Sequence, residues 1–192
     1  MAQSALPRFT LAQAVLPQTG LIKEVLQILG FSAIVGLTAQ ITIPLPFTPV
    51  PITGQTLGVL LTGAVLGSVR APLSLLSYLG IGALGVPVFA RTGGPATWGY
   101  LVGFVFAAFV VGWLAERGWD RTIGRSLLAM LIGNIVLYVP GLFWLATFVG
   151  ADKAIPLGLL PFIPGDIIKL LLAAAVLPSA WALFQRRQRH AP

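Results

Sequence analysis

The stretch Pro164-Gly-Asp-Ile-Ile-Lys-Leu-Leu-Leu-Ala-Ala-Ala-Val-Leu-Pro178 is apolar enough to span a membrane, yet it carries two charged residues, Asp166 and Lys169. Ionisable groups inside hydrocarbon are costly, so they normally face a bundle interior, pair with each other and mark a path or a binding site. Asp166 and Lys169 are three residues apart and therefore share one face of a helix. A salt bridge at the membrane boundary is the simpler interpretation of this pair, and a ligand site is the alternative.

The composition of the whole chain is that of a membrane protein. Of the 192 residues, 57% are hydrophobic and 9% are charged, whereas roughly a quarter of the residues in an average soluble domain are charged. A spanning helix needs about 20 mostly apolar residues, which leaves room for roughly six crossings and for no separate soluble domain. The sequence therefore predicts an all-α integral membrane protein.

Apolar segments bounded by proline, glycine or charged residues predict six membrane-spanning helices. They are expected at residues 21–43, 53–69, 71–90, 98–115, 122–149 and 164–184. Only the region of Arg70 separates the second span from the third, which predicts a tight antiparallel hairpin. The uncharged loop 44–51 holds four prolines and cannot continue a helix, so it is either a stiff connector or a lid. Residues 1–20 are expected to be a lead-in, 21–185 the transmembrane domain and 186–192 a basic tail.

The basic residues indicate the orientation of this bundle. With both termini on one side, that side carries Arg8, Lys23, Arg70, Arg117, Arg121, Arg125, Arg186, Arg187 and Arg189. The other side carries only Arg91 and Lys153, apart from Lys169 within the sixth span. Because cytoplasmic loops carry the excess of Lys and Arg, both termini are predicted to be cytoplasmic. The net charge of +7 then reflects topology, and nucleic-acid binding is not expected.

The sequence does not favour an enzyme. The chain has no cysteine, and its single histidine, His190, lies in the C-terminal tail, so no metal or cofactor is expected. No stretch fits the phosphate loop of nucleotide hydrolases, and the five acidic residues are scattered. An intramembrane enzyme would need a nucleophile with a base, a metal set or a histidine, and none is visible.

Polar groups near the outer end of the predicted bundle suggest a small-molecule pocket. The candidate binding residues are Asp166, Lys169, Arg91, Tyr100, Gln55 and Asn134. Apolar and aromatic walls with a few convergent polar groups are typical of such pockets. Asn134 lies nearer the cytoplasmic half by residue count, and helix packing is its simpler role.

The first span carries small residues at the spacing of close helix contacts. Ser32 and Gly36 are four residues apart, as in small-xxx-small motifs. Packing within the bundle is the simpler explanation for this spacing. The alternative is a small face that points outward toward a partner protein.

Four motifs, in this order, resemble the BioY family of biotin transporters. They are the proline-rich run 43–63, the run 78–90, the turn 93–104 and Pro164-Gly-Asp-Ile-Ile-Lys169. The resemblance implies a six-helix S component of an energy-coupling factor (ECF) transporter in the bacterial plasma membrane. Such a protein binds biotin in an outward-facing pocket capped by the loop after the first helix. The resemblance also implies partners, namely a membrane-embedded T component that Ser32 and Gly36 would dock, and two ATPase subunits.

The resemblance implies roles for the candidate residues. Biotin offers ureido N–H groups, a ureido carbonyl, a thioether ring and a carboxylate. Asp166 is expected to accept from a ureido N–H, and Lys169 or Arg91 to face the carboxylate or the carbonyl, with Asn134 and Tyr100 completing the hydrogen bonds. Two other functions stay open from the sequence: an S component for another vitamin, and a small integral-membrane enzyme that modifies lipids.

Overall fold

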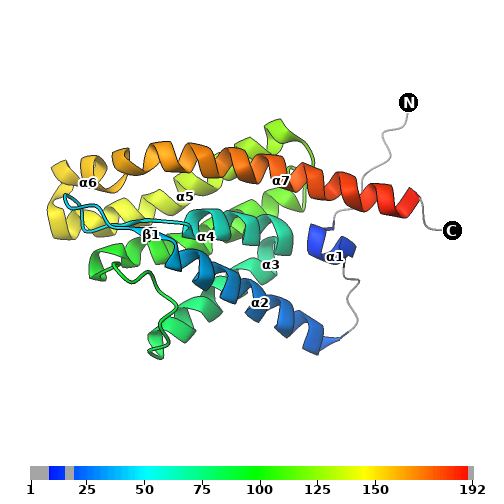
Figure 1. The fold of residues 1–192 in the computed structure, drawn as a ribbon, viewed down its shortest axis with the longest axis horizontal. Helices are drawn as coiled ribbons and strands as arrows, with labels where there is room; N and C mark the ends of the chain where they lie inside the picture. The colour runs from blue at the N-terminus through cyan, green and yellow to red at the C-terminus, as the bar shows by residue number, and fades with distance from the viewer. Residues whose placement is uncertain (1–8, 16–19, 190–192) are drawn as a thin grey trace.

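Helices account for most of the residues that the structure, a computed structural model, describes, namely 9–15 and 20–189 (Figure 1). The α-helices are α1 (Leu11–Val15), α2 (Leu21–Gln40), α3 (Gln55–Ala83), α4 (Trp98–Ala115), α5 (Ile123–Val149), α6 (Ala151–Gly158) and α7 (Ile163–Arg189). They are joined in part by the 3-10 turns η1 (Pro95–Thr97) and η2 (Leu160–Phe162) and by the strands β1 (Thr42–Ile43) and β2 (Ile52–Thr53). Apart from these two short strands, the predicted all-α architecture is confirmed.

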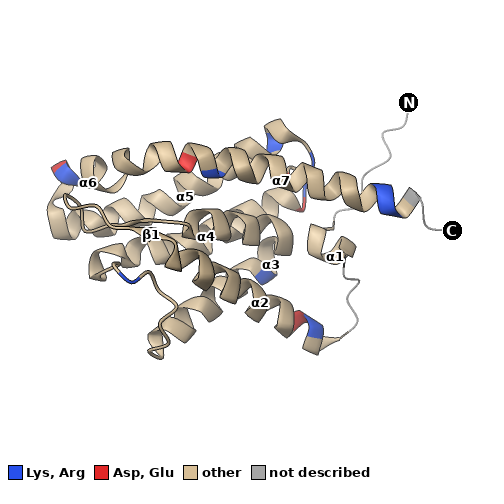
Figure 2. Ribbon diagram, in the orientation of Figure 1, with Lys and Arg blue, Asp and Glu red and all other residues tan. Residues whose placement is uncertain are grey.

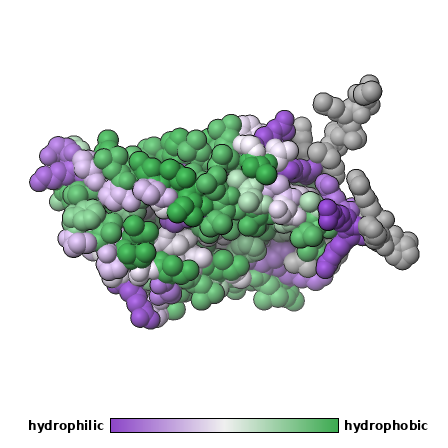
Figure 3. All heavy atoms as spheres, turned by 45° about the horizontal axis from the view of Figure 1, so that its top comes forward, coloured by the Kyte–Doolittle hydropathy of each residue, from purple (hydrophilic) through white to green (hydrophobic). Residues whose placement is uncertain are grey.

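The surface has the polarity expected of a membrane-spanning bundle. Among the described residues, five helical segments are long and apolar enough to cross a membrane, and α3 is one of them. Figure 3 shows a hydrophobic belt between hydrophilic ends. Figure 2 shows most of the charged residues near the two ends of the bundle. This distribution fits the predicted multi-pass membrane protein.

Helix α3 is a helical hairpin that contains the predicted second and third spans. Its backbone is helical except at Gly67, whose φ of 87° and ψ of −178° reverse the chain. The side chains of Gln55 and Tyr78, 23 residues apart, are joined by a hydrogen bond of 2.7 Å. A straight helix would hold these residues roughly 35 Å apart, so the two halves must run antiparallel. The predicted hairpin is confirmed, and it turns at Gly67, just before Arg70.

Close packing against α4 fixes this turn. A Cβ atom on Gly112 would lie 2.4 Å from the carbonyl carbon of Gly67, so the two backbones are in direct contact. The Glu116 carboxylate accepts hydrogen bonds from the backbone N–H of Ser68 at 2.7 Å and from its hydroxyl at 2.9 Å. A carboxylate at the start of the second half of α3 also offsets the partial positive charge of a helix N-terminus. The hairpin therefore depends on two glycines and one acidic residue.

Other helix boundaries differ from the predicted spans. Helix α2 ends at Gln40, because the next residues form β1 and pair with β2. The second half of α3 ends at Ala83, since Gly85 takes a φ of 90° and the chain leaves the helix there. Helix α6 lies between the predicted fifth and sixth spans, and α7 continues to Arg189. The basic tail is therefore helical over its described residues.

Helix α2 packs with Ser32 and Gly36 toward the interior. Ser32 is 2% exposed, and Gly36 is also buried. A Cβ atom on Gly36 would lie 3.5 Å from Val88 and 3.9 Å from Tyr78. The structure corrects the expectation that these two residues form an outward docking face: their small size gives room for the α3 hairpin and the loop after it.

The outer face of α2 is the least covered in the bundle. Of its most apolar 18-residue window only 17% is buried, against 61% for Pro95–Ala115. The exposed residues on this face include Gly30, Ala33 and Leu37. This face lies open to lipid or to another protein.

Helix α1 and the C-terminal part of α7 meet at one end of the bundle. The Arg121 guanidinium lies 4.5 Å from the ring centroid of Trp181 and 5.7 Å from that of Phe9. The Trp181 indole N–H donates to the Asp120 carboxylate at 2.5 Å, and Asp120 is 1% exposed. Part of the expected lead-in is therefore packed against the bundle. Its residues 1–8, with Arg8, and 16–19 lie outside the described residues, as do 190–192 of the tail.

Candidate functional site

A pocket opens at the end of the bundle opposite α1. It holds about 690 Å³ of empty space when its open mouth is included, and its mixture of apolar walls and a few polar groups is typical of small-molecule sites. Its apolar and aromatic walls include Val50, Pro51, Phe89, Trp98, Leu101, Leu137 and Phe162. Its polar residues are Thr53, Gln55, Thr56, Thr97, Tyr100, Tyr138, Asp166 and Lys169.

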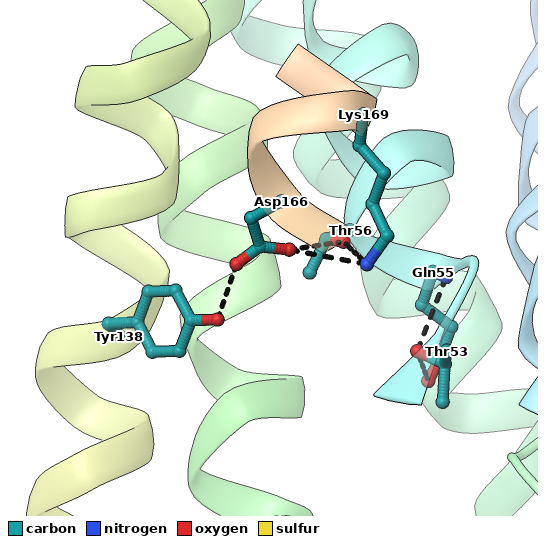
Figure 4. A network of polar contacts seen from close by, with 6 residues as sticks. All are labelled: Thr53, Gln55, Thr56, Tyr138, Asp166 and Lys169. Atoms are coloured by element: carbon teal, nitrogen blue, oxygen red, sulfur yellow. Dashed lines mark hydrogen bonds and ion pairs between the residues drawn. The ribbon is translucent and has the colours of Figure 1, made fainter. Parts of the chain in front are cut away.

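Asp166 and Lys169 form an ion pair on this pocket wall, one turn apart on α7 (Figure 4). Lys169 Nζ lies 3.2 Å from Asp166 Oδ1 and donates to the Thr56 hydroxyl at 2.8 Å. The Tyr138 hydroxyl donates to Asp166 Oδ2 at 2.5 Å. Because Asp166 is only 5% exposed, these neighbours rather than bulk water compensate its charge. The pair is thus a salt bridge and part of a pocket at the same time.

The network leaves limited hydrogen-bonding capacity for a ligand. A carboxylate has about four lone-pair sites, and those of Asp166 receive Tyr138, Lys169 and, at 3.5 Å, Thr56. An ammonium has three donors, and Lys169 directs two of them to Asp166 and Thr56. Within the described residues, one acceptor site on Asp166 and one donor on Lys169 therefore remain for a ligand. That pattern matches the N–H and C=O edge of a cyclic amide or urea.

Gln55 closes the pocket at the start of α3. Its Nε2 donates to the Tyr78 hydroxyl at 2.7 Å, and its Oε1 accepts from the Thr53 hydroxyl at 3.1 Å. The amide is therefore held at both its oxygen and its nitrogen, which fixes its orientation. The loop before it is placed by the β1–β2 pair, in which Thr42 lies opposite Thr53.

Two tyrosines stand edge to face beside the ion pair. The rings of Tyr100 and Tyr138 have centroids 5.9 Å apart and planes at 86°. The Tyr100 hydroxyl donates to the backbone carbonyl of Gly158, at the end of α6, at 2.8 Å. Tyr100 therefore contributes a ring face to the pocket, while its hydroxyl is used to hold α6.

The proline-rich loop covers one side of the pocket. Val50 and Pro51 are on the pocket wall. The hydroxyl of Thr48, a buried residue, donates to the carbonyl of Leu157 at 2.8 Å and so ties the loop to α6. Of the two interpretations of this loop, the contacts fit a lid better than a bare connector.

Arg91 and Asn134 do not reach the pocket wall as the structure describes it. Arg91 is exposed and directly follows Ala90, which lines the mouth. Asn134 is 6% exposed and lies one helical turn before Tyr138 on α5. Its Oδ1 has no hydrogen-bond partner within the described part of the chain. The structure brings together the other four candidates, Asp166, Lys169, Tyr100 and Gln55.

Sequence reasoning missed Tyr138 and Thr56, the two residues that complete the ion-pair network. Tyr138 is an ordinary aromatic residue in an apolar span and lies 28 positions from Asp166, so nothing local marks it. Thr56 follows Gln55 directly, and on a helix this puts it about 100° around the axis. Only the packing of α7 against α3 and α5 brings the three residues together.

Comparison with known proteins identifies the family to which this architecture belongs. The model of the BioY family matches residues 7–186, nearly the whole chain. The chain belongs to the BioY family. The four motifs that suggested this resemblance are therefore part of a similarity that covers all the membrane-spanning segments.

Individual BioY proteins from bacteria and archaea are similar to the chain over most of its length. The biotin transporter BioY of Rhizobium etli is 43% identical over 78% of this chain and 88% of its own. The probable biotin transporter BioY of Pyrococcus horikoshii is 42% identical over 80% of this chain and 93% of its own. The biotin transporter BioY of Thermotoga maritima is 39% identical over 76% and 88%.

A solved structure shares the fold. The S-component for biotin from an ECF-type ABC transporter superimposes with a TM-score of 0.71 and 25% sequence identity. The match covers 89% of this chain and 93% of the other. The two halves of α3 count as two crossings, so the five spanning segments among the described residues give the six crossings predicted for an S component.

Proposed function

We propose that this chain is the biotin-binding S component of an ECF transporter. It captures biotin in the outward-facing pocket and passes it to an ATP-driven module made of a T component and two ATPase subunits. Membership of the BioY family and the names of its relatives support this proposal. The family's members are named as transporters, so the chain is a transporter and not an enzyme.

The observation that carries the proposal is the ion pair in the pocket wall, in which Asp166 keeps one unused acceptor site and Lys169 one unused donor. A neutral cyclic urea presents N–H and C=O on one edge and would satisfy both. In this pose Asp166 accepts from a ureido N–H and Lys169 donates to the ureido carbonyl. A ligand that lacks either the N–H or the C=O would leave a buried polar group without a hydrogen bond, which is costly.

The rest of biotin suits the remaining walls. The thioether ring is apolar and polarizable, and rings such as Tyr100 and Phe89 offer it favourable contacts. The carboxylate then points toward the mouth, where Arg91 follows the lining residue Ala90. Arg91 would act as a cation at the rim, screened by water, so its contribution to affinity is expected to be small. Asn134, behind the wall, is assigned no contact with the ligand.

The orientation follows from the charges. The end that carries α1 and the last turns of α7 also holds most of the basic residues, so the termini are proposed to lie in the cytoplasm of a bacterial cell, with the pocket open to the outside. Residues 21–185 are proposed to form the transmembrane domain, with a lead-in at 1–20 and a basic tail at 186–192.

The T component is proposed to dock on the outer face of α2. This face is largely uncovered and contains Gly30 and Ala33, whose small size would let another helix approach closely. Ser32 and Gly36 then serve the packing of α2 on α3 and not the contact with the partner.

Mass spectrometry of the purified protein tests the proposed ligand. Protein purified from biotin-replete cells is washed, denatured and its released small molecules are identified. Recovery of biotin near one molecule per chain is expected. Recovery of a different vitamin would keep the fold but change the ligand, and recovery of a modified lipid with turnover of added lipid would favour the enzyme.

A further inference from the structure

Tyr138 is the residue that controls how much of the Asp166 carboxylate a ligand can reach. Its hydroxyl donates to Asp166 Oδ2 at 2.5 Å, and both side chains line the pocket (Figure 4). The other oxygen, Oδ1, already faces Lys169 at 3.2 Å and Thr56 at 3.5 Å. Each carboxylate oxygen therefore has a protein donor before any ligand arrives.

The Tyr138 ring is held in this position by packing. Tyr100 meets it edge to face, with planes at 86°. Tyr100 is in turn fixed by its hydrogen bond to Gly158 and by Gly141, where a Cβ atom would lie 2.4 Å from the Tyr100 ring. Because its neighbour cannot turn, the Tyr138 hydroxyl stays directed at Asp166.

This arrangement distinguishes two kinds of ligand head group. A neutral urea directs one N–H at one acceptor site. A guanidinium cation binds a carboxylate best through two parallel N–H bonds, one to each oxygen, and such charged bonds are roughly twice as strong as neutral ones. Lys169 and Thr56 take both sites on Oδ1 and Tyr138 takes one of the two on Oδ2, so a single acceptor site remains and the paired geometry cannot form.

We propose that Tyr138 is a specificity-determining positioning residue: by occupying Asp166 Oδ2 it reserves the site for a neutral cyclic urea or amide and rejects a cationic guanidine of the same shape. This inference rests on the proposed function, since biotin supplies the urea. It adds a residue and a selection rule to that function, because the ligand is sorted by the charge of its head group as well as by its shape.

The test compares biotin with 2-iminobiotin, in which a guanidine replaces the urea, at a pH where the guanidine is protonated. The affinities of both are measured for the wild type, for Tyr138→Phe and for the control Thr147→Val. In Tyr138→Phe, Oδ1 keeps Lys169 and Thr56, but Oδ2 loses its donor and has two lone pairs free for guanidinium N–H groups. The preference for biotin is therefore expected to fall by about tenfold or more, the usual effect of a hydrogen bond to a charged group. Thr147→Val also removes one hydroxyl, but from an exposed residue outside the pocket that donates to the Trp144 carbonyl, and its preference is expected to stay within about twofold of the wild type.

The ratio of the two affinities is the decisive quantity, because a loosened pocket would weaken both ligands together. A folded Tyr138→Phe protein with the wild-type preference would overturn the inference, and so would an equal change in Thr147→Val. If Tyr138→Phe does not fold, 3-fluorotyrosine at position 138 preserves the packing and strengthens the donor, and the preference for biotin should then rise; an unchanged preference contradicts the inference. If the wild type binds biotin but the variants at position 138 show no change in preference, the inference fails and the proposed function stands. A wild type that binds neither ligand overturns both.

Discussion

The side-chain amide of Gln55 donates a hydrogen bond to the Tyr78 hydroxyl at 2.7 Å. This contact joins the pocket wall to the second half of α3, against which α2 packs. The Tyr78 ring also stands edge to face with Phe89, a pocket residue, at 5.3 Å between centroids. From the other side, Gly36 of α2 lies against the same ring. A change on the inner face of α2 is therefore expected to reach the pocket.

Gly36→Leu tests this connection. A leucine side chain would have to displace Val88 and Tyr78, which lie within 4 Å of the position of its Cβ. Overpacking of this kind costs about 1–3 kcal/mol of stability, and the displaced Tyr78 would release Gln55. The melting temperature and the calorimetric affinity for biotin should both fall.

Gly30→Leu is the matched control on the same helix, since nothing lies within 4 Å of its Cβ position. Melting and biotin affinity should stay unchanged, while biotin uptake in cells and copurification of the T component should drop, because a large side chain prevents close helix approach. Normal binding in Gly36→Leu, or normal uptake in Gly30→Leu, would contradict the respective assignment of the inner or outer face.

Asp166→Asn and Lys169→Ala are each expected to weaken biotin binding by about 1.5–3 kcal/mol, the range for hydrogen bonds to charged groups. Calorimetry on detergent-solubilised protein measures the loss, and a melting curve verifies that each variant is folded. Arg91→Ala is the control, because it removes a basic residue that is exposed and off the pocket wall; it should change the affinity by less than about 1 kcal/mol. Wild-type affinity in both pair variants would reduce the ion pair to a purely structural role.

Thr48→Val tests the lid. The substitution keeps the shape of the side chain and removes the hydroxyl that ties the proline-rich loop to Leu157 on α6. Biotin should dissociate several-fold faster, with a smaller change in the association rate, because the loop would open more often. Stopped-flow displacement of a fluorescent biotin derivative measures both rates. An unchanged dissociation rate would show that the loop is a connector and does not retain the ligand.

Asp120, at the end of the bundle that holds α1, is expected to make the stability of the fold depend on pH. Burial raises the pKa of this carboxyl, and the hydrogen bond from Trp181, its own backbone and the charge of Arg121 only partly oppose the shift. A group whose pKa is higher in the folded state stabilises the fold most below its unfolded pKa of about 4. That stability is lost as the pH rises through the folded value.

Asp120→Asn should remove this pH dependence. It keeps an acceptor for Trp181 without a buried charge, so at pH 7 it should be at least as stable as the wild type, by up to about 1 kcal/mol. Melting temperatures between about pH 4 and pH 8 test this prediction, with the exposed Asp152→Asn as the control that follows the wild-type profile. A variant that melts well below the wild type at neutral pH would mean that the charge itself stabilises the fold.

Much of the fold could be predicted from the sequence because a membrane imposes simple rules. Runs of apolar residues marked the spans. Only the region of Arg70 separates the second span from the third, so the two had to form a hairpin. The turn itself fell at Gly67, where the conformation needs a positive φ and where Gly112 leaves space for the backbone. That requirement depends on the neighbouring helix and is invisible in local sequence.

Sequence reasoning could identify only those site residues whose charge contrasts with the apolar residues around them. Asp166 and Lys169 are conspicuous as charges in an apolar span, and they do lie in the pocket. Arg91 stood out as a cation in the loop between the predicted third and fourth spans, but it is exposed and lies outside the pocket wall. Tyr138 was overlooked because a tyrosine in a helix carries no such contrast. The direction in which Ser32 and Gly36 face could not be known either, since small residues serve internal and external contacts equally well.

Titration of the purified, biotin-free protein with biotin by calorimetry tests the central claim most directly. The account predicts saturation at one biotin per chain, at least tenfold weaker binding in Asp166→Asn, and no saturable binding of other vitamins under the same conditions. A folded wild type that gives no saturation with biotin, and saturates instead with a different vitamin, would contradict it.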